Sequence, residues 1–218
     1  MKPLLYIFDL DGTLVDTRVD ITNAINEMLS HYSIPPKSVE EVTSYVGNGF
    51  IPLIKRCLSV RKDLENQVDK ALEYFRDAYA RRLVENTRLY PGIKELLEKL
   101  NSSEDRALMA ILTNKDVNYA NEIIKKLGIG KYFSIVVGGN SLPKKKPSPD
   151  GVYHILNKTG IGREMVLLIG DGGNDVLTAK NAGIKSVFVR WGFKDEESLP
   201  VKPDYVVSNP LEILNISI

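Results

Sequence analysis

The chain has 218 residues, of which 43% are hydrophobic and 26% are charged, and its net charge is +1. These values are ordinary for a globular protein and favour neither nucleic acid nor a membrane surface as a partner. The single cysteine, Cys57, excludes an internal disulfide. No apolar run approaches the ~20 residues of a membrane span, and the first apolar stretch is too short for a signal peptide. We therefore expect a cytoplasmic protein without a membrane or nucleic-acid partner.

Six short apolar runs are predicted to be buried strands. They cover residues 4–8, 108–112, 135–137, 166–169, 186–189 and 205–207, the last with the weakest pattern. From residue 90 onward, stripes with helical spacing at 93–100, 120–127 and 176–182 alternate with these runs. Strands that alternate with helices indicate an α/β fold with a parallel sheet and right-handed crossovers.

Residues 17–84 interrupt this alternation. The segment contains helical stripes at 21–32 and 64–79, separated by Pro35 and Pro36, and no convincing strand. We interpret 17–84 as an inserted helical cap domain, a candidate lid over the strand ends. Residues 1–16 and 85–218 would then form a Rossmann-like catalytic core. The alternative is that these helices simply pack on the sheet.

Polar residues follow four of the predicted strands. They are Asp9 and Asp11, then Thr113 and Asn114, then Lys146 at the end of a lysine run, and finally Asp171 and Asp175. In a parallel sheet, ligands bind outside the carboxyl ends of the strands. We therefore expect these side chains to meet at one edge of the sheet.

The residue types at this edge suit phosphoryl transfer. The four aspartates would repel one another, and a hard divalent cation such as Mg²⁺ would relieve this repulsion. One carboxylate can attack phosphorus, and a second can donate and accept the proton. Lys146, Thr113 and Asn114 could hold phosphate oxygens and stabilise charge in the transition state.

Each group also has a purely structural interpretation. Asp11 with Gly12 could form a turn, and Thr113 with Asn114 could cap a helix. The lysine run could be a solvated loop. The glycines around Asp171 could form a phosphate-binding loop without catalysis.

Together the four polar segments that follow these strands resemble the motifs of the haloacid dehalogenase-like superfamily of hydrolases. These are Asp-x-Asp-Gly-Thr at 9–13, an apolar strand ending in Thr at 110–114, Lys-Pro-x-Pro at 146–149 and Gly-Asp-x-x-x-Asp at 170–175. They occur in the expected order, and the resemblance covers the whole chain. In this superfamily the segment between the first two motifs carries a helical cap.

The resemblance implies a role for each motif residue. Asp9 would be the nucleophile that forms an aspartyl-phosphate and also a Mg²⁺ ligand. Asp11 would be the general acid and base, with its backbone carbonyl on the metal. Thr113 and Lys146 would bind the transferring phosphoryl group, although a shift in register would put Lys144 or Lys145 in place of Lys146. Asp171 would ligate Mg²⁺ and Asp175 would support it.

Within the predicted cap, the segment Gly47-Asn48-Gly49 followed by Arg56 resembles the phosphoglycolate phosphatase subgroup. Residues 90–92 and 190–193 add to that likeness. These cap residues would bind the substrate, and Arg56 could meet a carboxylate. The alternative for the two glycines is a helix boundary, with Pro52 in the first turn of the next helix. Gly172, where a serine is common, weakens the subgroup assignment.

We therefore expect a Mg²⁺-dependent phosphatase that acts on a small phosphorylated metabolite, with phosphoglycolate favoured by resemblance. The alternatives are a phosphosugar mutase similar to β-phosphoglucomutase, a nucleotidase or a pyrophosphatase. A dehalogenase would need neither Asp11 nor a metal. A non-enzymatic alternative is a phospho-acceptor signalling domain. The sequence leaves a monomer and a homodimer both open.

Overall fold

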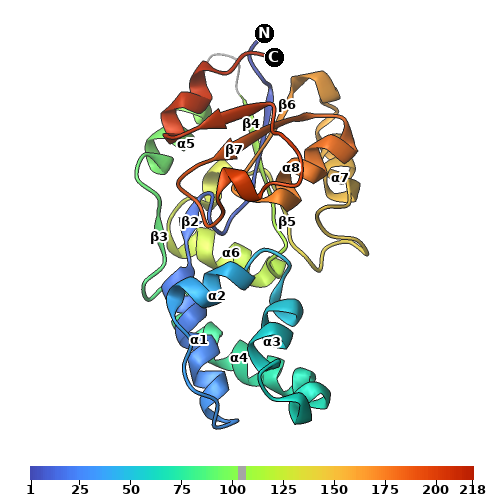
Figure 1. Cartoon of the computed structure of the whole chain (residues 1–218). Coiled ribbons are helices and arrows are strands. Elements are labelled where there is room, and N and C mark those ends of the chain that lie inside the picture. Colours follow the sequence, from blue (N-terminus) through green and yellow to red (C-terminus); the bar gives the residue numbers. More distant parts are fainter. Residues whose placement is uncertain (103–106) are drawn as a thin grey trace. The chain divides into compact units, whose positions relative to one another are not determined.

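The computed structural model describes residues 1–102 and 107–218 (Figure 1). The chain divides into two compact units. The sheet unit consists of Met1–Asp16 and Leu89–Ile218, and the helical unit is Thr17–Arg88. Two short strands, β2 (Val15–Asp16) and β3 (Arg88–Leu89), pair with each other as a two-stranded sheet. None of the described helices is long and apolar enough to cross a membrane.

The sheet unit is built on six strands in the order β5-β4-β1-β6-β7-β8, and every pairing between neighbours is parallel. The strands are β1 (Leu5–Phe8), β4 (Leu108–Leu112), β5 (Ile135–Val137), β6 (Val166–Gly170), β7 (Lys185–Val189) and β8 (Tyr205–Val207). Each predicted run forms a strand, with bounds that differ by at most one residue. The predicted α/β class and parallel sheet are confirmed.

Strand β1 lies at the centre of this sheet because it pairs with β4 on one side and β6 on the other. Leu5 lies opposite both Leu108 and Val166. All four residues of β1 are buried, which explains their continuous apolar character. A central strand that is apolar throughout places whatever follows it in the middle of the sheet edge.

Among the described residues, the sheet is flanked by helices α5 (Ile93–Asn101), α6 (Val117–Lys126), α7 (Asp150–Thr159) and α8 (Gly173–Ala182). Helices α5 and α6 lead towards the β5 edge and α7 and α8 lead back, so right-handed crossovers put the two pairs on opposite faces. Helices α7 and α8 lie beside each other (Figure 1) and contact β4 and β6 respectively. Leu5 and Ile7 of β1 share one core cluster with Val152 of α7 and Ala179 of α8.

Both units also contain short 3₁₀ helices. They are Lys62–Gln67 in the helical unit and Gly130–Tyr132, Arg163–Met165, Glu196–Ser198 and Pro210–Asn215 in the sheet unit.

The helical unit contains α1 (Arg18–Ser30), α2 (Val39–Tyr45), α3 (Phe50–Leu58) and α4 (Val68–Arg82). Helix α1 packs along α4, and the rings of Phe75 and Tyr79 stack in the buried centre, 5.5 Å apart. The first predicted stripe, 21–32, is too long because α1 ends at Ser30 and Ser33 has a φ of 52°. The second, 64–79, is divided, because Leu64 lies in a 3₁₀ turn before α4 begins.

Candidate active site

Three of the candidate residues lie directly beyond strands of the sheet unit. Asp9 follows β1, Thr113 follows β4 and Asp171 follows β6. The backbone N–H of Asp9 donates to the carbonyl of Ile169 at 2.8 Å, and that of Thr113 donates to Val137 at 2.9 Å. These bonds continue the parallel ladders by one residue. The strand ends therefore hold the three side chains at the same edge of the sheet, as predicted.

Three carboxylates gather at this edge. One oxygen from each of Asp9, Asp171 and Asp175 lies within 4.8 Å of the other two. Asp175 belongs to the first turn of α8, where its Oδ2 accepts a hydrogen bond of 3.1 Å from the backbone N–H of Gly172. The backbone at Gly170 packs so closely that a Cβ there would lie 2.1 Å from Cγ of Asp175. The acid cluster is thus built by strand ends and a helix start.

Lys146 inserts its ammonium group into this cluster. Its Nζ lies 2.9 Å from Oδ1 of Asp9 and 2.5 Å from Oδ1 of Asp175, and its side chain is only 2% exposed. Lys144 and Lys145 are exposed, so the structure places Lys146 and not its neighbours at the site. The solvated-loop interpretation holds for those two neighbours and is wrong for Lys146.

Burial and like charge set the protonation of the acid cluster. Burial, with the charges of Asp9 and Asp175 added, raises the pKa of Asp171 to about 8. Burial also raises the pKa of Asp9 to about 6, although Lys146 opposes this shift. For Lys146, burial disfavours the charged form, but the charges of Asp175 and Asp9 outweigh it and raise the pKa. Burial and neighbouring carboxylates therefore disfavour the ionised forms of Asp171 and Asp9.

This donor set fits a hard divalent cation. The carboxylates of Asp9, Asp171 and Asp175 offer only oxygen atoms, which Mg²⁺ prefers, and they are close enough to share one ion. A cation there would favour the ionised form of Asp171, which burial and, to a smaller extent, the charges of Asp9 and Asp175 disfavour. The side chain of Asp11 lies outside this carboxylate cluster, so its predicted metal contact would use the backbone carbonyl.

Asp11 has a separate partner that the sequence analysis missed. Both of its carboxylate oxygens lie 2.9 Å from Nζ of Lys115, whose side chain is 1% exposed. Lys115 directly follows Thr113 and Asn114, so a lysine just beyond a buried strand end was the available signal. Asn114 instead donates from Nδ2 to the backbone carbonyl of Lys146 at 3.0 Å. The structure thereby links the second motif to both the first and the third.

The helix-cap interpretation of Thr113 and Asn114 is wrong. Helix α6 begins later, and its N-cap is Asp116, whose side chain accepts from the backbone N–H of Asn118 at 2.9 Å. Thr113 lies one residue beyond β4, where its Oγ1 accepts from the backbone N–H of Lys115 at 3.2 Å. The threonine is therefore left at the sheet edge with the acids.

The loop after β7 supports Asp171. The backbone N–H of Phe193 donates to Oδ2 of Asp171 at 2.7 Å. Two glycines let the chain pass close by: a Cβ at Gly12, where φ is +80°, would lie 2.2 Å from Oδ2 of Asp171, and one at Gly192 would lie 2.2 Å from its Cβ. In the sequence, residues 190–193 show only a likeness to the phosphoglycolate phosphatase subgroup. Their contact with an acid 22 residues earlier in sequence has no local signal.

The candidate substrate residues Gly47, Asn48, Gly49 and Arg56 belong to the helical unit. Gly49 is the N-cap of α3 with a φ of 82°, and Pro52 lies in the first turn of that helix, as the helix-boundary interpretation predicted. The guanidinium of Arg56 lies over the ring of Tyr45, 5.8 Å from its centroid.

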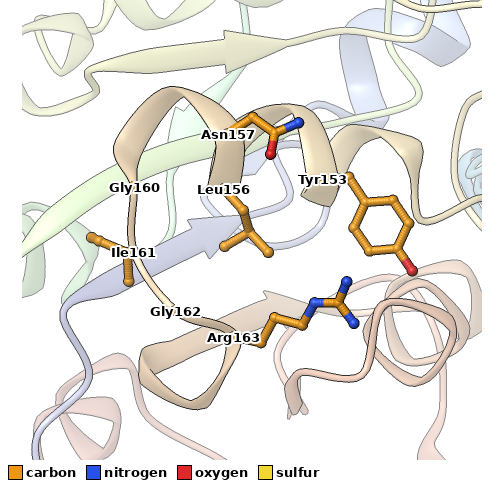
Figure 2. A pocket seen from close by; sticks show the side chains of 7 residues that line it. All are labelled: Tyr153, Leu156, Asn157, Gly160, Ile161, Gly162 and Arg163. Atoms are coloured by element: carbon orange, nitrogen blue, oxygen red, sulfur yellow. The ribbon is translucent and has the colours of Figure 1, made fainter.

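A separate pocket lies at the end of α7 and the loop that leads into β6 (Figure 2). It is lined by Tyr153, Leu156, Asn157, Gly160, Ile161, Gly162 and Arg163. The guanidinium of Arg163 lies 5.0 Å from the centre of the Tyr153 ring. This pocket precedes β6, whereas the acid cluster follows the strands. It contains none of the residues that the sequence predicts for the site.

Comparison with known proteins places the chain in a family. The model of the haloacid dehalogenase-like hydrolase family matches residues 6–189, a range that includes all four motifs. The chain belongs to this family. It is a phosphatase that acts on small phosphoesters. Phosphatases of the family are generally Mg²⁺-dependent, which agrees with the acid cluster.

The relatives of this hydrolase cover nearly its whole length. A phosphoglycolate phosphatase of Vibrio parahaemolyticus is 37% identical over 97% of the chain and 95% of that protein. One from Haemophilus influenzae is 34% identical over 96% of each. The crystal structure of a predicted phosphoglycolate phosphatase from Haemophilus somnus superposes with a TM-score of 0.91 and 31% identity, over 99% of this chain and 98% of that one.

The comparisons confirm the sequence prediction of a phosphatase in this hydrolase family. Its relatives are hydrolases of phosphoric monoesters, so the phospho-acceptor signalling domain is no longer an alternative.

Proposed function

We propose that this phosphatase hydrolyses a small phosphomonoester, with phosphoglycolate as the favoured substrate, through an aspartyl-phosphate on Asp9. One observation carries the proposal. The carboxylate of Asp9 lies at the end of the central strand, 2.9 Å from the ammonium of Lys146 and within the acid cluster, while Asp11 is held apart by Lys115. One sheet edge thus supplies a nucleophile, a cation for phosphate oxygens and a separate carboxyl for proton transfer.

The first half of the reaction breaks the ester. A carboxylate oxygen of Asp9 attacks the phosphorus, and the bond between phosphorus and the ester oxygen breaks. Asp11 in its protonated form gives its proton to that oxygen, so the alcohol leaves neutral. Lys146 and the hydroxyl of Thr113 hold the phosphoryl oxygens during the transfer, and the side-chain amide of Asn114 fixes the backbone at Lys146.

The second half regenerates the enzyme. Asp11, now a carboxylate, takes a proton from water as the water oxygen attacks the phosphorus of the aspartyl-phosphate. The bond between phosphorus and the Asp9 oxygen breaks, and inorganic phosphate leaves. Two carboxyls separated by one residue therefore divide the work into nucleophilic attack and proton transfer.

We assign Mg²⁺ to Asp9, Asp171 and Asp175, with the backbone carbonyl of Asp11 as a further ligand. When bound, the ion supplies positive charge that offsets the developing charge on the phosphoryl oxygens. Phe193 holds Asp171 in place for this contact through the 2.7 Å bond to its Oδ2.

We assign selection of the leaving group to the helical unit, acting as a cap. Two features of this unit support the role. The glycine-rich segment Gly47-Asn48-Gly49 precedes α3, and the exposed guanidinium of Arg56 lies in the last turn of that helix. A guanidinium can bind a carboxylate through two parallel hydrogen bonds, which suits the carboxylate of phosphoglycolate. Relatives named phosphoglycolate phosphatases, one of them 37% identical, support the same substrate.

The cytoplasmic location and the monomeric or homodimeric state stay predictions from the sequence.

The test is a survey of kcat/KM with Mg²⁺ over phosphoglycolate, glycerol phosphate, sugar phosphates, nucleotides and pyrophosphate. Asp9→Asn should lose all measurable turnover while keeping its fold, as checked by circular dichroism. Asp77→Asn, an exposed acid on α4, is the matched control and should behave like the wild type. Activity of Asp9→Asn at the wild-type level would overturn the mechanism.

The same survey separates the alternatives. A phosphosugar mutase would need a bisphosphate activator and would return the phosphoryl group to sugar, so release of free phosphate without an activator argues against it. A clear preference for nucleotides or pyrophosphate would replace phosphoglycolate as the substrate and leave the role of Asp9 intact.

A further inference from the structure

Asp11 and Lys115 form an ion pair that joins the first and second motifs. Lys115 contacts both oxygens of Asp11 at 2.9 Å, across 104 residues of sequence. The Lys115 side chain is 1% exposed and the Asp11 side chain is 13% exposed. Lys146, the other buried lysine, contacts Asp9 and Asp175 instead. The two lysines therefore contact different acids of the site.

The backbone at Lys115 is held from both sides. Its N–H donates to Oγ1 of Thr113 at 3.2 Å, and its carbonyl accepts from the N–H of Gly139 at 2.7 Å. Gly139 must be a glycine in this arrangement, because a Cβ there would lie 2.3 Å from the carbonyl oxygen of Asn114. The position from which the Lys115 side chain starts is thus fixed by the chain around it.

We propose that Lys115 is a positioning residue for proton transfer, and the proposal rests on the proposed function of Asp11. Contact with both oxygens limits rotation of the Asp11 carboxyl. The carboxyl is thereby held in one orientation relative to the ester oxygen. The same residue orients the Thr113 hydroxyl through its backbone N–H. Lys115 thereby sets the relative placement of the proton-transfer group and a phosphate-binding group without itself touching the reacting atoms.

Two structural arguments favour this role over direct phosphate binding. Lys115 contacts both oxygens of the proposed proton-transfer carboxylate, whereas Lys146 contacts Asp9, the proposed nucleophile to which the phosphoryl group is transferred. A proton-transfer group must also be correctly oriented twice in each cycle, first towards the leaving oxygen and then towards water. A small error in its orientation slows both steps, because proton transfer depends steeply on geometry.

The test uses a substrate that separates the two steps. The leaving group of p-nitrophenyl phosphate departs without a proton, whereas phosphoglycolate releases an alkoxide that needs one. Rapid mixing with Mg²⁺ measures the burst of nitrophenolate and the later steady rate. The variants are Lys115→Met, Lys115→Arg, Asp11→Asn and the double variant, with Lys126→Met as control, since Lys126 pairs only loosely with Glu122 at 3.7 Å on the surface of α6.

With the aryl ester, Lys115→Met should keep a burst of one nitrophenolate per enzyme at nearly the wild-type rate. Its steady rate should fall about 10- to 100-fold, less than the 10²- to 10⁴-fold range of a lost general acid or base that we expect for Asp11→Asn. With phosphoglycolate, kcat should fall while KM changes less than about threefold, since the phosphate contacts remain. The double variant should be no slower than Asp11→Asn alone, because both changes act on one group.

Three results would overturn the proposal: Lys115→Met turning over like the wild type, a slowed burst with raised KM, or additive losses in the double variant. The first means that Asp11 needs no such support, and the second assigns Lys115 to phosphate binding. If Lys115→Met does not fold, Lys115→Arg decides: it keeps the charge but changes the geometry, so the steady rate should still fall and the burst remain.

Failure of the proposed function would look different. If Asp11→Asn turns over like the wild type, Asp11 is not the proton-transfer group, whatever Lys115 does. If Asp11→Asn is slow and both Lys115 variants are fast, only the role of Lys115 is wrong.

Discussion

The ammonium of Lys146 lies 2.5 Å from Oδ1 of Asp175, a residue 29 positions later in the chain. The same ammonium contacts Asp9 at 2.9 Å, so one buried cation joins the proposed nucleophile to the helix that completes the acid cluster. The bridge has consequences that can be measured separately from those of the metal.

Replacing Lys146 by Met should lower kcat by roughly 10²- to 10³-fold, the range for losing one charged group that stabilises a transition state. Mg²⁺ binding, measured by calorimetry, should not weaken, because a positive charge has been removed from beside the acids. Lys144→Met, at an exposed position two residues earlier, should leave both quantities unchanged. If Lys144→Met lowered kcat and Lys146→Met did not, Lys144 would be the lysine of the third motif.

Gly192→Ala should weaken Mg²⁺ binding by about tenfold or more, because displaced ligands lose affinity steeply. The added Cβ would lie 2.2 Å from Cβ of Asp171 and 2.6 Å from the carbonyl oxygen of Gly12. Gly172→Ala is the matched control, since its Cβ would have no contact closer than 3.7 Å. Titration of Mg²⁺ against activity and against intrinsic Trp191 fluorescence gives two independent readouts. Equal affinities in the two variants would contradict the role of the 190–193 loop.

The metal-free protein should lose thermal stability as the pH rises from about 4 to about 8. Folding raises the pKa of Asp171 from 3.8 to about 8 and that of Asp9 from 3.8 to about 6. A carboxyl with a raised pKa binds its proton more tightly when folded, so its contribution is full below pH 3.8 and is lost as the pH rises through the folded pKa. Tm measured by differential scanning fluorimetry checks this sign.

Added Mg²⁺ should raise Tm most at about pH 8, where the ion replaces the lost protons, with roughly 2–4 °C expected for each kcal/mol of binding at this size. Asp171→Asn should flatten the pH dependence and reduce the Mg²⁺ effect. A Tm that rises between pH 4 and 8 without metal would contradict the assigned pKa shifts.

Replacing Arg56 by Gln should raise KM for phosphoglycolate by about 10-fold or more, the order expected for losing a charged hydrogen bond. KM for glycerol phosphate, which lacks the carboxylate, should change little. Arg61→Gln is the control, since Arg61 pairs with Asp63 at 2.7 Å on the surface of the helical unit. An equal change for both substrates would mean that Arg56 acts on the fold of the unit and not on the carboxylate.

Asp20→Asn should destabilise the helical unit by about 2–3 kcal/mol, the range for charged hydrogen bonds lost in the interior. The buried carboxylate accepts from the backbone N–H of Asn86 at 2.9 Å and from the N–H and hydroxyl of Thr87 at 2.8 and 2.7 Å. An amide in its place would turn a donor towards one of these donors. Urea unfolding measures the loss, with the exposed Asp77→Asn as the unaffected control.

Much of the fold was predictable because local patterns determine it. Strand β1 is buried on both faces because it is a central strand. Burial on both faces requires apolar side chains at all four consecutive positions, which the sequence shows directly. The positions of Asp9, Thr113 and Asp171 followed directly, since each comes one residue after a strand. Errors in the helical unit arose where a 3₁₀ turn divides an apolar stripe, as at Leu64, or where the helix ends before the stripe does, as at Ser30.

The residue types at the site were determined by the sequence alone: acids, a threonine and a lysine that follow parallel strands. Only the tertiary structure decided which partner each one has. The sequence contains three adjacent lysines at the third motif. In the structure it is Lys146 that is buried and contacts Asp9. The sequence shows a lysine, Lys115, just beyond a strand end, but not that its partner is Asp11. It also does not show that Phe193 holds Asp171, because those bonds join segments 104 and 22 residues apart. Ion pairs and hydrogen bonds depend on distances of a few ångströms, and only the packing of strands and loops sets such distances between residues far apart in sequence.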